Sequence, residues 1–314
     1  MISCTEFIPL YSELFKYLEK IGGKREVEKY WEYISDNYTS VFLGDEVASN
    51  GIRGCWNYWS KSLNEEACDF AMELDEKEGT FLIDMRRCPS KGHLLEYEHI
   101  EPYHNYCGHC PALYDRCLEK YGIYPDGHDL SKTDVASCKL RYRTETRIPQ
   151  GETLHMDRLA SDNEYFHRDF HISAKRGVEY VGNMFGDDAV NEYLSSFAKT
   201  YYAPLISLLK KNGLSEMKRY IEETYIAEKH PENVLCVLSE DGLSVKVSDC
   251  PGVMYIKERG FEPTKWYIEL TRTVNAVIAE EAGFKDASYF TKSFKASFGM
   301  TPKDFRNQFK DNFI

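Results

Sequence analysis

The first part of the chain has the apolar spacing of helices. Between residues 10 and 18 the apolar side chains recur every three or four positions, and after a break at Gly22-Gly23 a similar spacing resumes. Such spacing places apolar side chains on one face of a helix. We therefore predict helices from residue 7 to about residue 43, followed by an aromatic-rich helix over residues 51–63.

A change to alternating apolar and polar positions predicts strands after these helices. Residues 70–74 and 80–85 alternate on either side of a polar turn that contains Gly79, as the two strands of a hairpin do. After a polar loop, a helix is expected to begin near Tyr103, and residues 136–142 alternate as a third strand. Helices followed by a second hairpin, over residues 234–238 and 243–247, are predicted in the later part of the chain.

This plan recurs because the sequence contains an internal repeat. Short identical motifs return at separations of 161 to 163 residues. The matched pairs are Val27 with Val190, Tyr30 with Tyr193, Asn50-Gly51 with Asn212-Gly213, Tyr58 with Tyr220, Cys88-Pro89 with Cys250-Pro251, Glu101-Pro102 with Glu262-Pro263, Tyr106 with Tyr267, and Gly122 with Gly283. Recurrence at a nearly fixed separation is the mark of a duplicated unit.

The repeat sets the predicted domain organisation. A cysteine-rich first repeat spans residues 1–148, a polar linker 149–164, and a second repeat 165–283, with a tail over 264–314 that overlaps the last helix of the second repeat. Helices combined with small hairpin-based sheets predict an α+β fold of two tandem homologous domains with antiparallel sheets, followed by a helical tail.

The tail has the pattern of a helix-turn-helix. An apolar helix reaches Gly283, a short polar turn follows, and a second helix is expected from Ser288 until Gly299. A second helix of this kind can lie in the major groove of DNA. On it, the residues expected to face bases or phosphates are Ser288, Thr291, Lys292 and Lys295.

This tail resembles the second helix-turn-helix of the AraC/XylS regulators. The residues that carry the resemblance are Ile278, Ala279, Gly283, Phe284, Asp286, Ser288, Tyr289, Phe290, Phe294, Lys295, Gly299, Pro302 and Arg306. That family carries two such units in tandem, and no first unit is evident upstream. We therefore expect a homodimer, which would supply the second DNA-binding surface. By the repeat, however, the helix over 264–282 is the counterpart of residues 103–121, so it belongs to a repeat as well as to the tail.

Charge is distributed unevenly along the chain. The whole chain has a net charge of −12, yet residues 285–314 hold five lysines and one arginine against three aspartates, which leaves −15 on the rest. An acidic body argues against a surface coated generally with nucleic acid, whereas a basic end suits local anion binding. No amino-terminal signal sequence and no apolar run of membrane-spanning length is evident, so we expect a cytoplasmic protein without membrane contact.

The ten cysteines are expected to be reduced in that compartment. Cys107 and Cys110 should lie at a helix start, where the helix field favours the thiolate. Together with Cys117 and Cys88 they are candidate ligands of a zinc or other divalent metal ion. Buried packing thiols and a disulfide-isomerase-like Cys-Gly-His-Cys site are the other interpretations. The second repeat has Ile268, Leu270, Thr271 and Ile278 opposite Cys107, His109, Cys110 and Cys117, so this chemistry belongs to the first repeat alone.

The body also resembles the family of L-2-amino-thiazoline-4-carboxylic acid hydrolases. The motifs that carry this resemblance are Arg87-Cys88-Pro89, the segment 107–117, and residues 133–138. The resemblance implies an α+β domain that hydrolyses a ring or only binds a ligand. As an enzyme, the domain would use Cys88 or Cys107 as nucleophile and His104 or His109 as base, the pairing that activates a thiol.

Two functions follow from these patterns. The first is a DNA-binding transcriptional regulator with a ligand-, metal- or thiol-sensing body, whose partners are DNA and a small molecule. The alternative is a cytoplasmic hydrolase that acts on C–N bonds of small sulfur or nitrogen compounds, with a tail that does not bind DNA.

Overall fold

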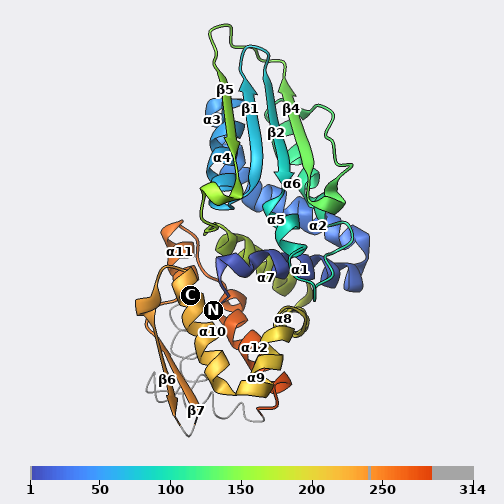
Figure 1. Ribbon diagram of the computed structural model, residues 1–314. Helices are drawn as coiled ribbons and strands as arrows, with labels where there is room; N and C mark the ends of the chain where they lie inside the picture. Colours follow the sequence, from blue (N-terminus) through green and yellow to red (C-terminus); the bar gives the residue numbers. More distant parts are fainter. Residues whose placement is uncertain (1, 240–241, 285–314) are drawn as a thin grey trace. The chain divides into compact units, whose positions relative to one another are not determined.

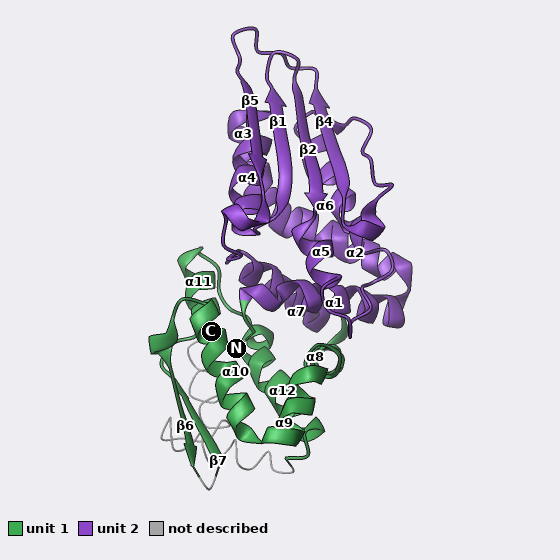
Figure 2. Ribbon diagram, in the orientation of Figure 1, with its two compact units in different colours: residues 1–3, 185–314 green, residues 4–184 purple. Residues whose placement is uncertain are grey.

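The structure is a computed structural model that describes residues 2–239 and 242–284 (Figure 1). Residue contacts divide the chain into two compact units (Figure 2). One unit is Cys4–Met184, and the other consists of Met1–Ser3 and Phe185–Ile314. Both combine helices with antiparallel strands, which confirms the predicted α+β class. Within the described residues, no helix has the length and apolar character needed to span a membrane.

The Cys4–Met184 unit contains seven of the described α-helices. Their bounds are α1 Phe7–Gly22, α2 Lys24–Ile34, α3 Asp45–Asn50, α4 Arg53–Glu65, α5 Pro89–Leu94, α6 His109–Glu119 and α7 Phe170–Phe185. A ten-residue π-helical segment, Ser35–Gly44, joins α2 to α3. The apolar face of α1 contributes Leu14, Phe15 and Leu18 to the core, as the helical spacing predicts.

Five strands form one antiparallel sheet in this unit, in the order β3-β4-β2-β1-β5. The strands are β1 Asp69–Asp75, β2 Thr80–Arg87, β3 Ile123–Pro125, β4 Cys138–Thr144 and β5 Thr153–Arg158. The predicted hairpin is β1–β2, in which Met72 pairs with Ile83. Alternate residues of both strands are buried, and α4 and α6 lie along one face of the sheet (Figure 1). Trp59 of α4 stacks on Phe81 there, with ring centroids 5.5 Å apart.

The other unit contains five described helices and a two-stranded sheet. Its elements are α8 Asp187–Tyr201, α9 Ala203–Asn212, α10 Leu214–Ala227, β6 Val234–Ser239, β7 Gly242–Val247, α11 Pro251–Glu258 and α12 Lys265–Glu281. Ile221 and Tyr225 of α10 pack against Cys236 of β6. Helix α12 lies against α8, where the Lys199 ammonium is 2.8 Å from the Glu281 carboxylate.

The succession α1-α2-α3-α4-β1-β2-α5-α6 has the same order as α7-α8-α9-α10-β6-β7-α11-α12. The breaks between elements correspond as well. Gly23 and Gly186, which follow the first helix of each series, have φ angles of 71° and 89°. Cys88 and Cys250 both occupy the N-cap position before a proline at the start of a helix. The two series thus share the order of their elements, while the sequence repeat itself stays a prediction.

Two boundaries differ from the sequence prediction. The segment expected as linker, 149–164, contains β5, which pairs with β1 along its whole length. Leu154 and Met156 of β5 pack against the core, while the side chains between and around them face solvent. Because β5 is an edge strand with mostly polar residues, its composition resembles that of a linker. In addition, α7, the first helix of the predicted second repeat 165–283, belongs to the Cys4–Met184 unit by its contacts.

The helix expected near Tyr103 begins six residues later, at His109. Tyr103 is instead held by α1, because its backbone N–H donates to Ser12 Oγ at 2.9 Å and its ring packs on Phe15. The third strand likewise begins at Cys138 rather than at 136, since Ala136 has a left-handed φ of 60°. In both places a tertiary contact or a backbone turn overrides the local pattern.

Candidate functional site

The end of α12 is the part of the predicted helix-turn-helix that the structure describes. Val274 and Ile278 are buried, and the helix ends before Gly283, whose φ of 90° suits the turn. The predicted DNA-contact residues Ser288, Thr291, Lys292 and Lys295 lie outside the described residues. Helix α12 therefore packs in its own unit and also leads directly into the predicted turn.

Four cysteines of the first unit lie near one another. Burial is the main cause that raises the pKa of the Cys110 thiol, and the charges of Cys88, Cys138 and Cys107 would add to it, so these thiols lie in one region. Cys117, a predicted metal ligand, is fully buried elsewhere: its Sγ is 4.0 Å from Ser40 Oγ. Among the described residues, the groups whose possible ligand atoms lie within 4.8 Å of one another contain none of the four predicted metal ligands. All ten cysteines are free.

Burial keeps these thiols protonated. It raises the pKa of Cys88 to about 12 and that of Cys138 to about 11. Burial also raises the pKa of Cys107, although the nearby Lys91 ammonium lowers it in part. The sequence-based expectation that the helix field would favour a thiolate at Cys107 and Cys110 is therefore wrong, because desolvation outweighs the helix dipole. None of these side chains is an activated nucleophile at neutral pH.

The two histidines predicted as bases have different surroundings. His109 is buried among aromatic rings, and its Nδ1 donates to the Tyr106 carbonyl. Burial lowers the pKa of His109 to about 4, and its Nε2 lies 3.5 Å from Cys110 Sγ. The neutral imidazole thus accepts a weak hydrogen bond from a neutral thiol. His104 is exposed, and its Nδ1 is 3.5 Å from a carboxylate oxygen of Glu19.

A second polar group in this unit lies where α4 ends. His167 Nδ1 is 2.7 Å from Glu65 Oε2, and Asp169 is close enough for three possible metal-ligand atoms to lie within 4.8 Å of one another. The Lys61 ammonium is 3.8 Å from Glu65 and 3.7 Å from Asp169. Burial alone would lower the pKa of His167, but the hydrogen bond to Glu65 and the neighbouring carboxylates raise it. This group is an ion-pair network that satisfies its own charges.

Glu66, the residue after Glu65, was not identified from the sequence. Burial raises the pKa of its carboxyl to about 7, against a partial lowering by His167. No donor lies within hydrogen-bonding distance of this carboxyl among the residues that the structure describes. Glu66 is half-buried and its oxygens are not among the buried atoms that lack a partner, so the carboxyl is open to water or to a ligand.

Four tyrosines lie close enough to this carboxyl for its charge to act on them. The negative charge of Glu66 adds to the effect of burial in raising the pKa of all four, which places them near it. We call these five residues the Glu66 cluster: Tyr38 of the π-helical segment, Tyr58 of α4, Glu66, Tyr114 of α6, and Tyr165 before α7.

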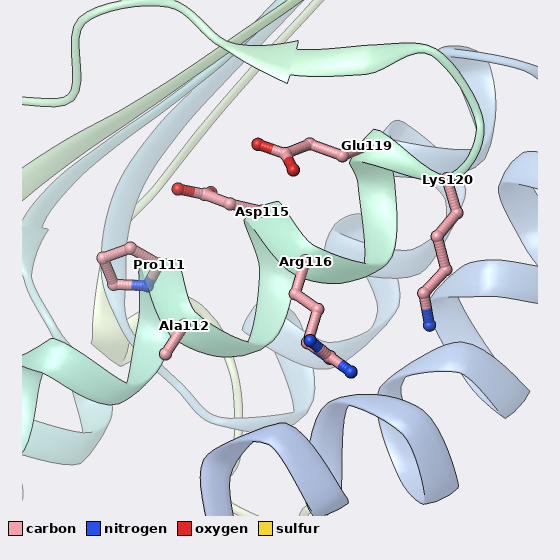
Figure 3. Close-up of a pocket in the computed structure, with 6 residues that line it drawn as sticks. All are labelled: Pro111, Ala112, Asp115, Arg116, Glu119 and Lys120. Carbon is pink, nitrogen blue, oxygen red and sulfur yellow. The ribbon is translucent and has the colours of Figure 1, made fainter. Parts of the chain in front are cut away.

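A separate recess lies on the outer surface of α6 and is lined by Pro111, Ala112, Asp115, Arg116, Glu119 and Lys120 (Figure 3). Three of its four charged groups have partners, and two of these, Arg116 and Lys120, both contact Asp36, at 2.8 and 2.7 Å. The Tyr142 hydroxyl donates to the Asp115 carboxylate at 3.0 Å. The recess contains none of the predicted cysteines or histidines.

Comparison with known protein families gives a match in the tail of the chain. Residues 276–307 match the model of bacterial regulatory helix-turn-helix proteins of the AraC family. Searches of curated proteins and of solved structures found no significant match to the chain. The predicted AraC-type tail is thus confirmed, whereas the hydrolase-like body has no family match. The matched segment supports a DNA-binding transcription regulator.

Proposed function

We propose that this protein is a transcriptional regulator in which residues 276–307 bind DNA and the Cys4–Met184 unit senses a small molecule. The observation that carries the proposal is the AraC-family match at 276–307. The charge distribution supports it, because the basic segment 285–314 can approach phosphates while the acidic remainder of the chain cannot.

Helix α12 is the element through which the body would act on the DNA reader. The matched segment begins at Ala276, inside α12, so the helix that packs against α8 is continuous with the first part of the helix-turn-helix. Polar contacts also join the two helices, including the 2.7 Å hydrogen bond from Trp266 Nε1 to Asp187. A shift of α12 against α8 would therefore reorient the DNA-binding segment directly.

A homodimer is part of this proposal. A single helix-turn-helix offers one recognition helix, and two half-sites read by a symmetric pair give the affinity that specific binding needs. The expected binding site is consequently a palindrome with half-sites one helical turn of DNA apart.

The test is DNA selection with the purified chain, followed by fluorescence anisotropy on the selected sequence. Charge reversal of Lys292 and Lys295 to Glu should abolish binding, because each removes a predicted phosphate or base contact and adds repulsion. Lys77→Glu, at the exposed β1–β2 turn, is the matched control and should bind as the unchanged protein does. Binding that survives both tail substitutions would refute the assignment of that helix.

The hydrolase alternative needs a reactive thiol, and the raised pKa values of Cys88 and Cys107 give it no support. It stays a prediction, as does a bound zinc or other divalent metal ion. Substrate screening of the Cys107→Ala variant and metal analysis of the purified protein test these two predictions.

A further inference from the structure

The Glu66 carboxyl has a structural counterpart in the other unit, Glu228, and the two differ in whether the protein supplies a hydrogen-bond donor. Glu66 and Glu228 both follow the last residue of a helix, α4 and α10, with φ angles of −89° and −79°. In each case the next residue, Ala67 or Lys229, has the left-handed φ that non-glycine residues avoid, at 49° and 61°. The duplicated fold thus presents the same carboxylate at the same place twice.

The second-unit carboxylate has a partner within the protein. Ser3 Oγ donates to Glu228 Oε1 at 2.8 Å, and Glu228 is only 2% exposed. The Glu66 carboxyl has no such donor among the described residues and is more accessible than Glu228. Tyr165 lies beside the end of α4, because the backbone N–H of the next residue, Phe166, donates to the Glu65 carbonyl at 2.8 Å. The Tyr165 hydroxyl is buried and also has no hydrogen-bond partner in the described part of the chain. Two polar groups are therefore left for a ligand at one place.

The surroundings are aromatic. Two of these rings, Tyr58 and Tyr114, lie on α4 and α6. Both contact Trp59, with ring centroids 5.4 and 5.0 Å away. Tyr58 and Tyr114 are only partly buried where they border the core of the unit, so part of each side chain remains free to pack on another molecule. Aromatic faces and a carboxylate together favour a positively charged organic group.

The local backbone also carries strain. Of the three described non-glycine residues with positive φ, Ala67 follows Glu66 directly in the chain. Such conformations cost free energy and gather at functional sites. The π-helical segment that supplies Tyr38 is a second feature of that kind.

We propose that the Glu66 cluster binds a small organic cation with an aromatic or alkyl body, the Glu66 carboxylate pairing with its charged group. A nitrogen cation with N–H donors would satisfy Glu66 and Tyr165 together, and the tyrosine rings would pack on its body. A hard metal ion is a poorer occupant, since it requires several oxygen ligands and the adjacent Glu65 and Asp169 are already engaged with His167 and Lys61. The inference rests on the proposed function in one respect: it takes this ligand to be the small molecule that regulates DNA binding.

The test uses three probes of one shape and different charge: biphenyl-4-carboxamidine, biphenyl-4-carboxamide and biphenyl-4-carboxylate. Binding to the full chain, without DNA, is measured by calorimetry and tryptophan fluorescence. The cationic amidine should bind about tenfold or more tightly than the neutral amide, and the anion should bind least, because only the amidine forms a charge-assisted pair with Glu66. Glu66→Gln should remove the preference for the amidine.

Glu78→Gln, in the exposed β1–β2 turn, makes the same change in net charge and should leave the preference intact. Equal affinities for amidine and amide, no binding of any probe, or a preference that survives Glu66→Gln would each overturn the inference. The comparison of the three probes on the unchanged protein tests the preference for a cation even if a variant fails to fold. Sequence-selective DNA binding without amidine binding would overturn this inference alone, whereas amidine binding without DNA binding would overturn the proposed function.

Discussion

Replacing Glu66 by glutamine should change how stability depends on pH. In the folded protein, burial raises the pKa of this carboxyl to about 7, whereas an unfolded glutamate titrates near 4.5. Below about pH 4.5 the group is protonated in both states and has no effect. Between these two values the unfolded chain releases the proton while the folded protein retains it, so stability falls as pH rises.

The loss levels off above about pH 7, where the folded carboxyl also ionises. A difference in pKa of this size corresponds to about 3 kcal/mol, an upper value because the side chain is only half-buried. Glu66→Gln cannot ionise and should avoid the loss. Relative to the unchanged protein, the variant should therefore gain about 2 kcal/mol more stability at about pH 8 than at about pH 5.

Urea unfolding followed by tryptophan fluorescence measures this difference. The signal reports mainly on the Cys4–Met184 unit, because Trp31, Trp56 and Trp59 lie there and only Trp266 lies in the other unit. Glu66 also helps to raise the pKa of His167, so the measured difference includes a change in the titration of His167. Glu78→Gln, an exposed carboxylate, should show no such gain. An equal effect of Glu66→Gln at both pH values would refute the account of a desolvated, unpartnered carboxyl.

Three further predictions concern the same unit. Ala67→Gly should stabilise it by about 0.5 to 1 kcal/mol in urea unfolding, because glycine adopts a φ of 49° without strain; the same change at Ala71, inside β1, should destabilise it. Arg53→Ala should cost about 3 kcal/mol in the same assay, since it leaves the buried Glu76 carboxylate without its paired 2.8 and 2.6 Å hydrogen bonds, and a loss near zero would show that the pair contributes little. Cys107 should react with iodoacetamide more slowly than glutathione does at neutral pH, as peptide mapping can show, because burial raises its pKa; faster alkylation would indicate a thiolate.

Elements with a strong local signal could be predicted from the sequence. Apolar spacing identified α1 and α4, and alternation around Gly79 identified the β1–β2 hairpin with its core positions Phe70 and Met72. The edge strand β5 was missed because half of its side chains face solvent and it pairs on one side only. Strand order and pairing depend on contacts distant in the sequence, which local patterns do not encode.

The candidate site was predicted only in part. Cys88, Cys107 and Cys110 lie in one region, which Cys138 joins from β4, whereas Cys117 lies apart. Joint chemistry of these thiols stays a prediction. Glu66 gave no local signal, since a glutamate at a helix end is usually solvated. Its recurrence as Glu228, at the separation of the repeat, was the one available clue.

The central claim is that residues 276–307 read DNA, and a salt titration of binding to a selected sequence tests it most directly. Specific binding should weaken steeply as salt increases, because lysines of the tail displace counterions from several phosphates. Lys292→Glu should flatten that dependence as well as weaken binding. If the folded full-length chain bound no DNA at low salt, the regulator would be contradicted.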